Sequence, residues 1–225
     1  GLAFIPDVRR GNLHLHLMYK ALFELASDRA EFVSRLFSRA RPSGLGASTR
    51  VSRLFEAYRA VPPDAGLFLA NQQALIAHLT GRHRFPLSPS DVAGIEGIYA
   101  AFYAGGPGLR FVSNRGGGRI SYPSFESLQT GTDREGGRHA YLASEEAYCR
   151  IRGMQARNLI VPLVGNFAGP RALSRVAAYV EGRQAIVSVF YASNVENYLF
   201  QDGLWQAFRA NVASLPTNER SRLIR

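Results

Sequence analysis

The fold is decided by residues 157–199, which read RNLIVPLVGNFAGPRALSRVAAYVEGRQAIVSVFYASNVENYL. Leu159–Val164 is a short, almost entirely apolar run without alternation, as expected of a strand buried on both faces. Pro170 is suited to the first position of a helix, where a missing N–H costs nothing. An apolar stripe then marks the helix Arg171–Glu181. Ala185–Tyr191 follows it as a second buried strand.

A strand, a helix and a second strand within about 30 residues form a βαβ unit. We therefore expect the two strands to lie parallel, with a right-handed crossover between them. Leu2–Pro6 is a third strand of the same apolar type, and a further strand begins at Arg222–Arg225. The sequence predicts an α/β fold with a Rossmann-like, mostly parallel sheet, in a single domain over residues 1–225. Because the chain starts inside a strand without an initiator methionine, we expect an N-terminally truncated fragment.

The stretch from residue 13 to residue 104 has helical periodicity almost throughout. Such a long helical excursion between strands indicates an insertion into the α/β domain. We interpret residues 13–104 as a helical cap that packs against the carboxyl ends of the strands and covers the crevice there. The helices predicted within this insertion are Leu13–Ala26, Arg29–Arg39, Val51–Tyr58, Gly66–Leu79 and Val92–Tyr103.

The net charge of +10 comes almost entirely from arginine, because Lys20 is the only lysine. The arginines are dispersed along the chain, whereas nucleic-acid-binding segments collect their basic residues into blocks. A nucleic-acid partner is therefore not favoured. Some of the charge is better explained by a smaller anionic ligand.

The sequence excludes several other classes of protein and site. No apolar run approaches the ~18–20 residues that span a bilayer, so we expect no membrane partner, and we expect a cytoplasmic location. Cys149 is the only cysteine, which rules out a disulfide scaffold or a cysteine-based zinc site within the chain. His14 and His16 are two positions apart on a predicted helix and point to different faces. We therefore predict no metal site.

Four polar residues each follow the carboxyl end of a predicted parallel strand: Asp7, Asn166, Ser193 and Asn194. Open α/β sheets bind their ligands along that edge, so we expect the four residues to converge on one crevice. Two alternatives stay open. Asp7 is also suited to cap the next helix or to pair with a neighbouring arginine, and Ser193 and Asn194 are suited to cap a helix beginning at Val195.

Several blocks of the sequence resemble a family of uncharacterised bacterial proteins, the LIC_10091-type family. They are Asp7–Arg10, Tyr19–Arg39, Thr132–Asp133 and Arg157–Pro170. Members of the family carry a further N-terminal segment with a GVGPEQNF-like stretch, which again implies that residues 1–225 are a fragment. The family has Asp where this chain has Asn166, so the resemblance gives no support to a catalytic carboxylate at that position. It implies kinship but no established activity.

A looser resemblance is to the nucleotide-binding sheet of class I S-adenosylmethionine-dependent methyltransferases. In those enzymes an acidic residue at the end of the second strand binds the ribose, as Asp7 would here. A later segment containing Ser and Asn lies beside the methionine, and Ala192–Glu196 is similar to it. This resemblance implies S-adenosylmethionine as cofactor, with Asn166 at the adenine edge and Ser193 and Asn194 near the methionyl end. The interval between the two motifs is longer than usual, and residues 1–225 lack the glycine loop that cradles the cofactor.

The leading hypothesis is a methyltransferase-like protein of unknown substrate. Methyl transfer depends mainly on positioning and desolvation, so the lack of a catalytic triad does not argue against it. Arg9 or Arg10 is suited to hold a carboxylate of the ligand, and Asp133, in a polar loop, is a further candidate contact whose alternative is a simple turn. The second hypothesis is a non-catalytic nucleotide- or metabolite-binding domain. The third, less favoured, is a nucleic-acid-binding module that uses the arginines.

Overall fold

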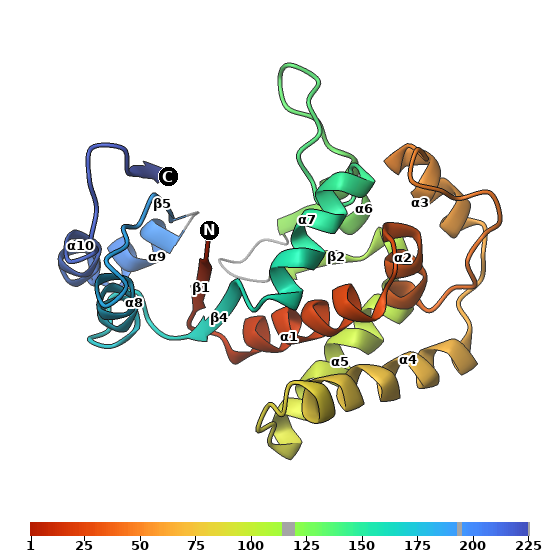
Figure 1. Cartoon of the computed structure of the whole chain (residues 1–225), viewed down its shortest axis with the longest axis horizontal. Helices are drawn as coiled ribbons and strands as arrows, with labels where there is room; N and C mark the ends of the chain where they lie inside the picture. The colour runs from red at the N-terminus through yellow and green to blue at the C-terminus, as the bar shows by residue number, and fades with distance from the viewer. Residues whose placement is uncertain (114–119, 193–194, 225) are drawn as a thin grey trace. The chain divides into compact units, whose positions relative to one another are not determined.

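The computed structural model describes residues 1–113, 120–192 and 195–224 of a mixed α/β chain. The chain divides into two compact units (Figure 1). Unit 1 contains Gly1–Leu13 and Ile160–Arg225, and unit 2 contains His14–Leu159. The second unit is therefore a continuous insertion into the first, and it extends well past residue 104.

Unit 2 is built mainly of helices, as the sequence predicts for residues 13–104. Its helical elements are α1 (Arg10–Leu25, which begins in unit 1), α2 (Arg29–Phe37), α3 (Val51–Arg59), α4 (Ala65–Ala77), the π-helix η1 (His78–Arg82), α5 (Pro89–Gly105), the 3₁₀-helix η2 (Gly106–Gly108), α6 (Phe125–Thr130) and α7 (Glu145–Ala156). Strands β2 (Arg110–Ser113) and β3 (Ile120–Ser124) form an antiparallel pair.

Three of these helices begin where the sequence places a capping residue. The side chain of Asp28 accepts a hydrogen bond from the backbone of Glu31 at the start of α2, and Ser144 caps α7 in the same way. Ser88 and Asp91 form a reciprocal capping box at the start of α5. Each cap satisfies backbone N–H groups that the helix itself leaves without a partner.

The core of unit 2 is dense and aromatic. The rings of Phe23 and Phe32 lie 4.5 Å apart, and those of Phe23 and Tyr148 lie 5.2 Å apart. Phe32 and Tyr148 are completely buried. The guanidinium of Arg29 is buried beside this core and donates to the carbonyl oxygens of Leu142 and of other loop residues, which holds those loops against the helices. Apolar burial on this scale is the main stabilising contribution to unit 2.

Unit 1 contains four short strands and three helices among the described residues. They are β1 (Ala3–Asp7), β4 (Ile160–Val164), α8 (Ala172–Glu181), β5 (Val189–Tyr191), α9 (Val195–Gln201), α10 (Trp205–Ala213) and β6 (Arg222–Ile224). Strands β1 and β4 pair in parallel over their whole length, from Ala3 opposite Ile160 to Asp7 opposite Val164. This confirms the parallel arrangement that their apolar sequences predict.

The second strand of the expected βαβ unit differs from the prediction. It is limited to Val189–Tyr191 rather than Ala185–Tyr191, and it pairs in parallel with β6 and not with β4. The shorter length follows from the hydrogen bonds of Val187. The N–H of Val187 donates to the carbonyl of Pro216, and its own carbonyl accepts from the Ser221 hydroxyl, so a loop has taken the groups that a longer strand would use. Among the described residues the strands therefore form separate pairs rather than one sheet.

Both strand pairs nevertheless pack on one helix. The buried face of α8 presents Val176, Ala177 and Val180, and this cluster is contacted by Phe4 of β1, Leu163 of β4 and Phe190 of β5. The helix itself begins at Ala172, two residues later than Pro170 suggests, because residues 167–170 form a turn. It ends at Gly182, as the sequence predicts.

Two prolines show which edges of β1 and β4 face each other. The N–H of Gly165 donates to the carbonyl of Asp7 at 2.9 Å, so Asp7 and alternate residues of β1 point their backbone groups toward β4. Pro6 and Pro162 lie at the intervening positions and face the outer edges, where their missing N–H groups disrupt no hydrogen bond of this ladder.

No helix among the described residues is both long and apolar enough to cross a membrane.

Candidate functional site

Asp7 ends β1 and anchors the start of α1. Its carboxylate accepts from the backbone N–H of Arg9 at 2.7 Å and from the Arg9 guanidinium at 3.1 Å, and it also accepts from the Asn12 amide. Burial alone would raise the pKa of Asp7, but these hydrogen bonds outweigh it and lower the pKa. The carboxylate is therefore ionised at neutral pH and is already engaged by Arg9, which is one of the two alternatives that the sequence leaves open.

Asn166 follows the neighbouring strand end. The hydrogen bond from Gly165 to the Asp7 carbonyl joins the two ends, so the loops after β1 and β4 start side by side. The Asn166 side chain is exposed, and its oxygen accepts from the Ala168 backbone at 2.9 Å, which shapes the turn before α8. The structure thus brings Asp7 and Asn166 to one edge of unit 1. Arg9 pairs with Asp7 and has an exposed side chain, and Arg10 opens α1.

Ser193 and Asn194 lie outside the described residues. Asp133 belongs to unit 2, where its carboxylate accepts from the backbone of Gly137 at 2.7 Å and pairs with His139 at 2.6 Å. These contacts close a surface turn, which is the simpler of the two interpretations of Asp133.

Unit 1 also contains a cavity of about 480 Å³. Its walls are largely apolar, with Trp205, Phe208 and Val212 from α10 and Leu223 from β6. Two charged side chains, Glu196 and Arg209, also line it. This pocket is open to solvent rather than enclosed.

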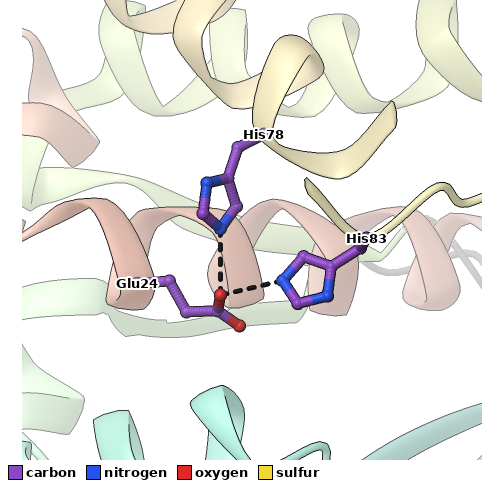
Figure 2. A group of neighbouring side chains, drawn as sticks. All are labelled: Glu24, His78 and His83. Carbon is purple, nitrogen blue, oxygen red and sulfur yellow. Dashed lines mark hydrogen bonds and ion pairs between the residues drawn. The ribbon is translucent and has the colours of Figure 1, made fainter. Parts of the chain in front are cut away.

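A separate cluster of ionisable side chains lies in unit 2 (Figure 2). Glu24 extends from α1, while His78 and His83 lie at the two ends of η1. The Nε2 atoms of His78 and His83 both lie against the same oxygen of Glu24, at 2.9 Å and 2.8 Å. All three side chains are at least 88% buried, with exposed fractions of 5% for Glu24 and 12% for each histidine.

The π-helical turn brings the two histidines together. In an α-helix with 3.6 residues per turn, side chains five positions apart point in different directions. Here the N–H of His83 bonds to the carbonyl of His78, which closes a wider turn of five residues. Both rings then lie on the side that faces Glu24, and their Nε2 atoms reach the same carboxylate oxygen (Figure 2). This turn ends the helical segment that α4 begins, because η1 follows α4 directly.

Two cations complete the surroundings of Glu24. The buried Lys20 ammonium donates to the second carboxylate oxygen at 2.7 Å and to the carbonyl of Gln155 at 2.6 Å. The guanidinium of Arg82 lies 3.7 Å from the oxygen that the histidines share. Burial would raise the pKa of Glu24, but hydrogen bonds from Lys20, His78 and His83 lower it to about 2. Glu24 is thus a permanently charged carboxylate beside two imidazoles.

This cluster could not be predicted from the sequence. Its members lie 54 and 59 residues apart in the chain, and only the packing of η1 against α1 joins them. The helix predicted over Gly66–Leu79 contains His78 but ends before His83, so the two histidines were not expected on one element. Gly81, which weakens an α-helix, was the one local signal for an altered turn.

Comparison with known proteins gives a partial match. Residues 124–225 are similar to a family described as a domain of unknown function, DUF7790. The matched stretch covers less than half of the chain and contains neither Asp7 nor Glu24, His78 and His83. No curated protein matches the chain.

Proposed function

We propose that unit 1 is part of a Rossmann-like domain that binds S-adenosylmethionine, in a methyltransferase-like protein of unknown substrate. The observation that carries this proposal is the position of Asp7. It lies at the carboxyl end of a parallel strand, beside the end of the neighbouring parallel strand, where open α/β sheets bind nucleotides. The resemblance of Asp7 and of Ala192–Glu196 to class I methyltransferases points to the same ligand.

The arrangement of the strands supports a larger sheet. The pairs β1–β4 and β5–β6 are both parallel and both contact α8, and each has an edge that pairs with no described strand. We propose that one further parallel strand joins β1 to β5. On the edges that it would use, β1 offers the Phe4 backbone and the Pro6 carbonyl, while β5 offers the Val189 and Tyr191 backbones. The N-terminal segment implied by the LIC_10091-type resemblance is a candidate for this strand and for the glycine loop.

Ligand binding at this edge requires that the ligand replace one of the hydrogen-bond donors to the Asp7 carboxylate. The two ribose hydroxyls would replace the Arg9 guanidinium as donors to the Asp7 carboxylate, which is ionised and therefore a strong acceptor. Arg9, with a side chain that is 62% exposed, would then be released to pair with the methionyl carboxylate. Asn166 has an amide that both donates and accepts, as recognition of an adenine edge requires.

The alternative is a domain that binds the same nucleoside without turnover. The two functions share the site and differ only in whether a methyl group leaves the cofactor. Formation of S-adenosylhomocysteine in the presence of candidate acceptors would separate them.

The proposal is tested by thermal unfolding of the natural chain, including any residues that precede Gly1. We expect millimolar S-adenosylmethionine or S-adenosylhomocysteine to raise the melting temperature of the wild-type protein by several degrees, because a ligand stabilises the state that binds it. Asp7→Ala should abolish this increase while leaving the unliganded melting temperature within a few degrees of the wild-type value. Asp202→Ala, which removes an exposed carboxylate of the same unit, is the matched control and should retain the increase. No increase with either ligand in the wild-type protein would refute the cofactor assignment.

A further inference from the structure

We propose that Glu24, His78 and His83 form a binding site for a divalent transition-metal ion, with Zn²⁺ as the ion that fits best. The site lies in unit 2 and is independent of the nucleotide site proposed for unit 1. It rests on the convergence of three ligand atoms, on their burial and on the π-helical turn that aligns two of them.

The set of donor atoms selects the class of ion. Two imidazole nitrogens and one carboxylate oxygen lie within 4.8 Å of one another. Imidazole favours Zn²⁺, Co²⁺ and Ni²⁺, whereas Mg²⁺ and Ca²⁺ prefer sites made of oxygen atoms. Two histidines and one glutamate are also a known protein ligand set for zinc, with the fourth position left for water or another molecule.

The observed distances are close to those that a bound ion needs. Ligand atoms about 2.0–2.1 Å from a tetrahedral Zn²⁺ lie about 3.3 Å from each other. The Glu24 oxygen lies 2.9 Å from the His78 nitrogen and 2.8 Å from the His83 nitrogen. An opening of roughly 0.5 Å in each pair admits the ion, which small rotations of three side chains supply. Because each Nε2 already points at the shared oxygen (Figure 2), its lone pair would point at the ion.

The residues around the three ligands orient the carboxylate. Lys20 holds the Glu24 oxygen that faces away from the histidines and is itself fixed by the carbonyl of Gln155 on α7. Carboxylate ligands in metal sites are commonly held by such hydrogen bonds, which leave one oxygen for the ion. Arg82 is 69% exposed at the rim, so its guanidinium can turn toward solvent when a second cation enters.

The competing interpretation is a network of ion pairs that holds η1 against α1 without a metal. In that network both histidines donate their Nε2 protons to Glu24, whereas an ion requires those nitrogens to be free of protons. The two interpretations make different predictions for metal binding and similar ones for stability. Metal binding is therefore the decisive measurement.

The test is a titration of the whole chain, stripped with a chelator, with CoCl₂ and then ZnCl₂. We expect one equivalent of Co²⁺ to bind with the visible absorption of a tetrahedral nitrogen and oxygen site, and one equivalent of Zn²⁺ to displace it. His78→Ala and His83→Ala should each weaken Zn²⁺ binding at least tenfold. Glu24→Gln, which keeps an oxygen acceptor for Lys20, should weaken it similarly. His139→Ala removes an exposed histidine outside the cluster and should leave binding unchanged.

A second measurement guards against unfolded variants. Zn²⁺ should raise the melting temperature of the wild-type protein and of His139→Ala by several degrees, and it should raise that of Glu24→Gln by clearly less at the same concentration. The proposal is wrong if the wild-type protein binds no Zn²⁺ or Co²⁺, or if the three cluster variants fold and bind as tightly as the wild-type protein. Binding of Mg²⁺ as tight as that of Zn²⁺ would also overturn it.

Discussion

Phe32 in unit 2 is completely buried, whereas Phe200 in unit 1 is 70% exposed, and this contrast extends to the two units as a whole. Among the described residues of unit 2, the larger unit, the large apolar side chains that are exposed are Leu69 and Leu128. In unit 1 they are Leu2, Val8, Val164, Tyr179, Ile186, Val189, Tyr191, Tyr198, Phe200, Leu223 and Ile224. Unit 2 therefore buries nearly all of its large apolar side chains that the structure describes, whereas unit 1 leaves many of its own exposed.

The difference has its origin in the two architectures. Helices bury one stripe each, and those of unit 2 enclose a shared aromatic core. Parallel strands need cover on both faces, and those of unit 1 are covered by α8 on one side. Apolar side chains that stay exposed add nothing to the stability of unit 1, because the free energy of folding depends on the apolar area that is buried. Unit 1 should consequently be the less stable unit when the chain is studied alone.

The largest expected effect compares one phenylalanine in each unit. Phe32→Ala should lower the free energy of unfolding by about 3–5 kcal/mol, because it opens a cavity in a closed core. Phe190→Ala should cost only about 1–2 kcal/mol, because Phe190 is partly exposed already. Urea denaturation can follow the units separately, since Trp205 is the only tryptophan and lies in unit 1, while far-UV circular dichroism reports mainly the helices of unit 2.

The denaturation curves of the wild-type protein serve as the control. In the wild-type protein the Trp205 fluorescence should change at a lower urea concentration than the circular dichroism. Coincident transitions, together with equal losses for the two substitutions, would remove the proposed difference between the units.

An intermediate effect tests how tightly unit 2 is packed. A methyl group added at Gly94 on α5 would overlap the imidazole of His14, which is buried and bonded to Asp91 at 2.8 Å. Gly94→Ala should therefore destabilise unit 2 by about 1–3 kcal/mol. Gly97 lies one turn further along the same helix and has open space around it. Gly97→Ala should be neutral or stabilise by up to about 1 kcal/mol, because alanine is the better helix former. Equal melting temperatures for the two variants would contradict this account.

The smallest expected effect is on the stability of unit 2 at acid pH. Burial would raise the pKa of Glu31, but hydrogen bonds from the Ser27 hydroxyl and backbone and from Arg35 lower it to about 2, against an ordinary value of 4.5. A pKa lowered by folding adds stability that is complete above about pH 4.5 and is lost as the pH falls toward 2. Glu31→Gln should lower the free energy of unfolding by about 1 kcal/mol at pH 7. It should also make the free energy of unfolding of unit 2 depend less on pH between those values.

The control for the acid prediction is Glu56→Gln, whose exposed pair with Arg53 contributes little. The circular dichroism midpoint should keep its acid dependence in this variant. An unchanged acid dependence in Glu31→Gln would show that other groups govern the response of unit 2.

Features that depend on residues close together in the chain could be predicted from the sequence, whereas features that depend on distant residues could not. The caps at Asp28, Ser88 and Ser144 were predictable because each cap contacts residues within one turn of itself. The parallel pairing of β1 with β4 followed from two unalternating apolar runs. The early end of the ladder at Val189 did not, because it depends on a loop that reaches back to Val187 from a distant part of the chain.

The candidate sites follow the same division. The bond between Asp7 and Arg9 was open as an alternative because the two residues are neighbours in sequence. The Glu24 cluster was not predictable, since it needs both a long-range contact and a π-helical turn that local propensities do not favour. Two histidines five positions apart indicate a metal site only when the π-helical turn between them is known.

The burial of Lys20 has a practical consequence for the chemistry of the whole chain. It is the only lysine side chain, and its ammonium is held between the Glu24 carboxylate and a carbonyl of α7. Reagents and enzymes that acylate lysine amines should therefore find no reactive side-chain amine on the native protein. The rate of acylation at Lys20 should then measure how often unit 2 opens, because Lys20 reacts only in molecules in which α1 has become exposed to solvent.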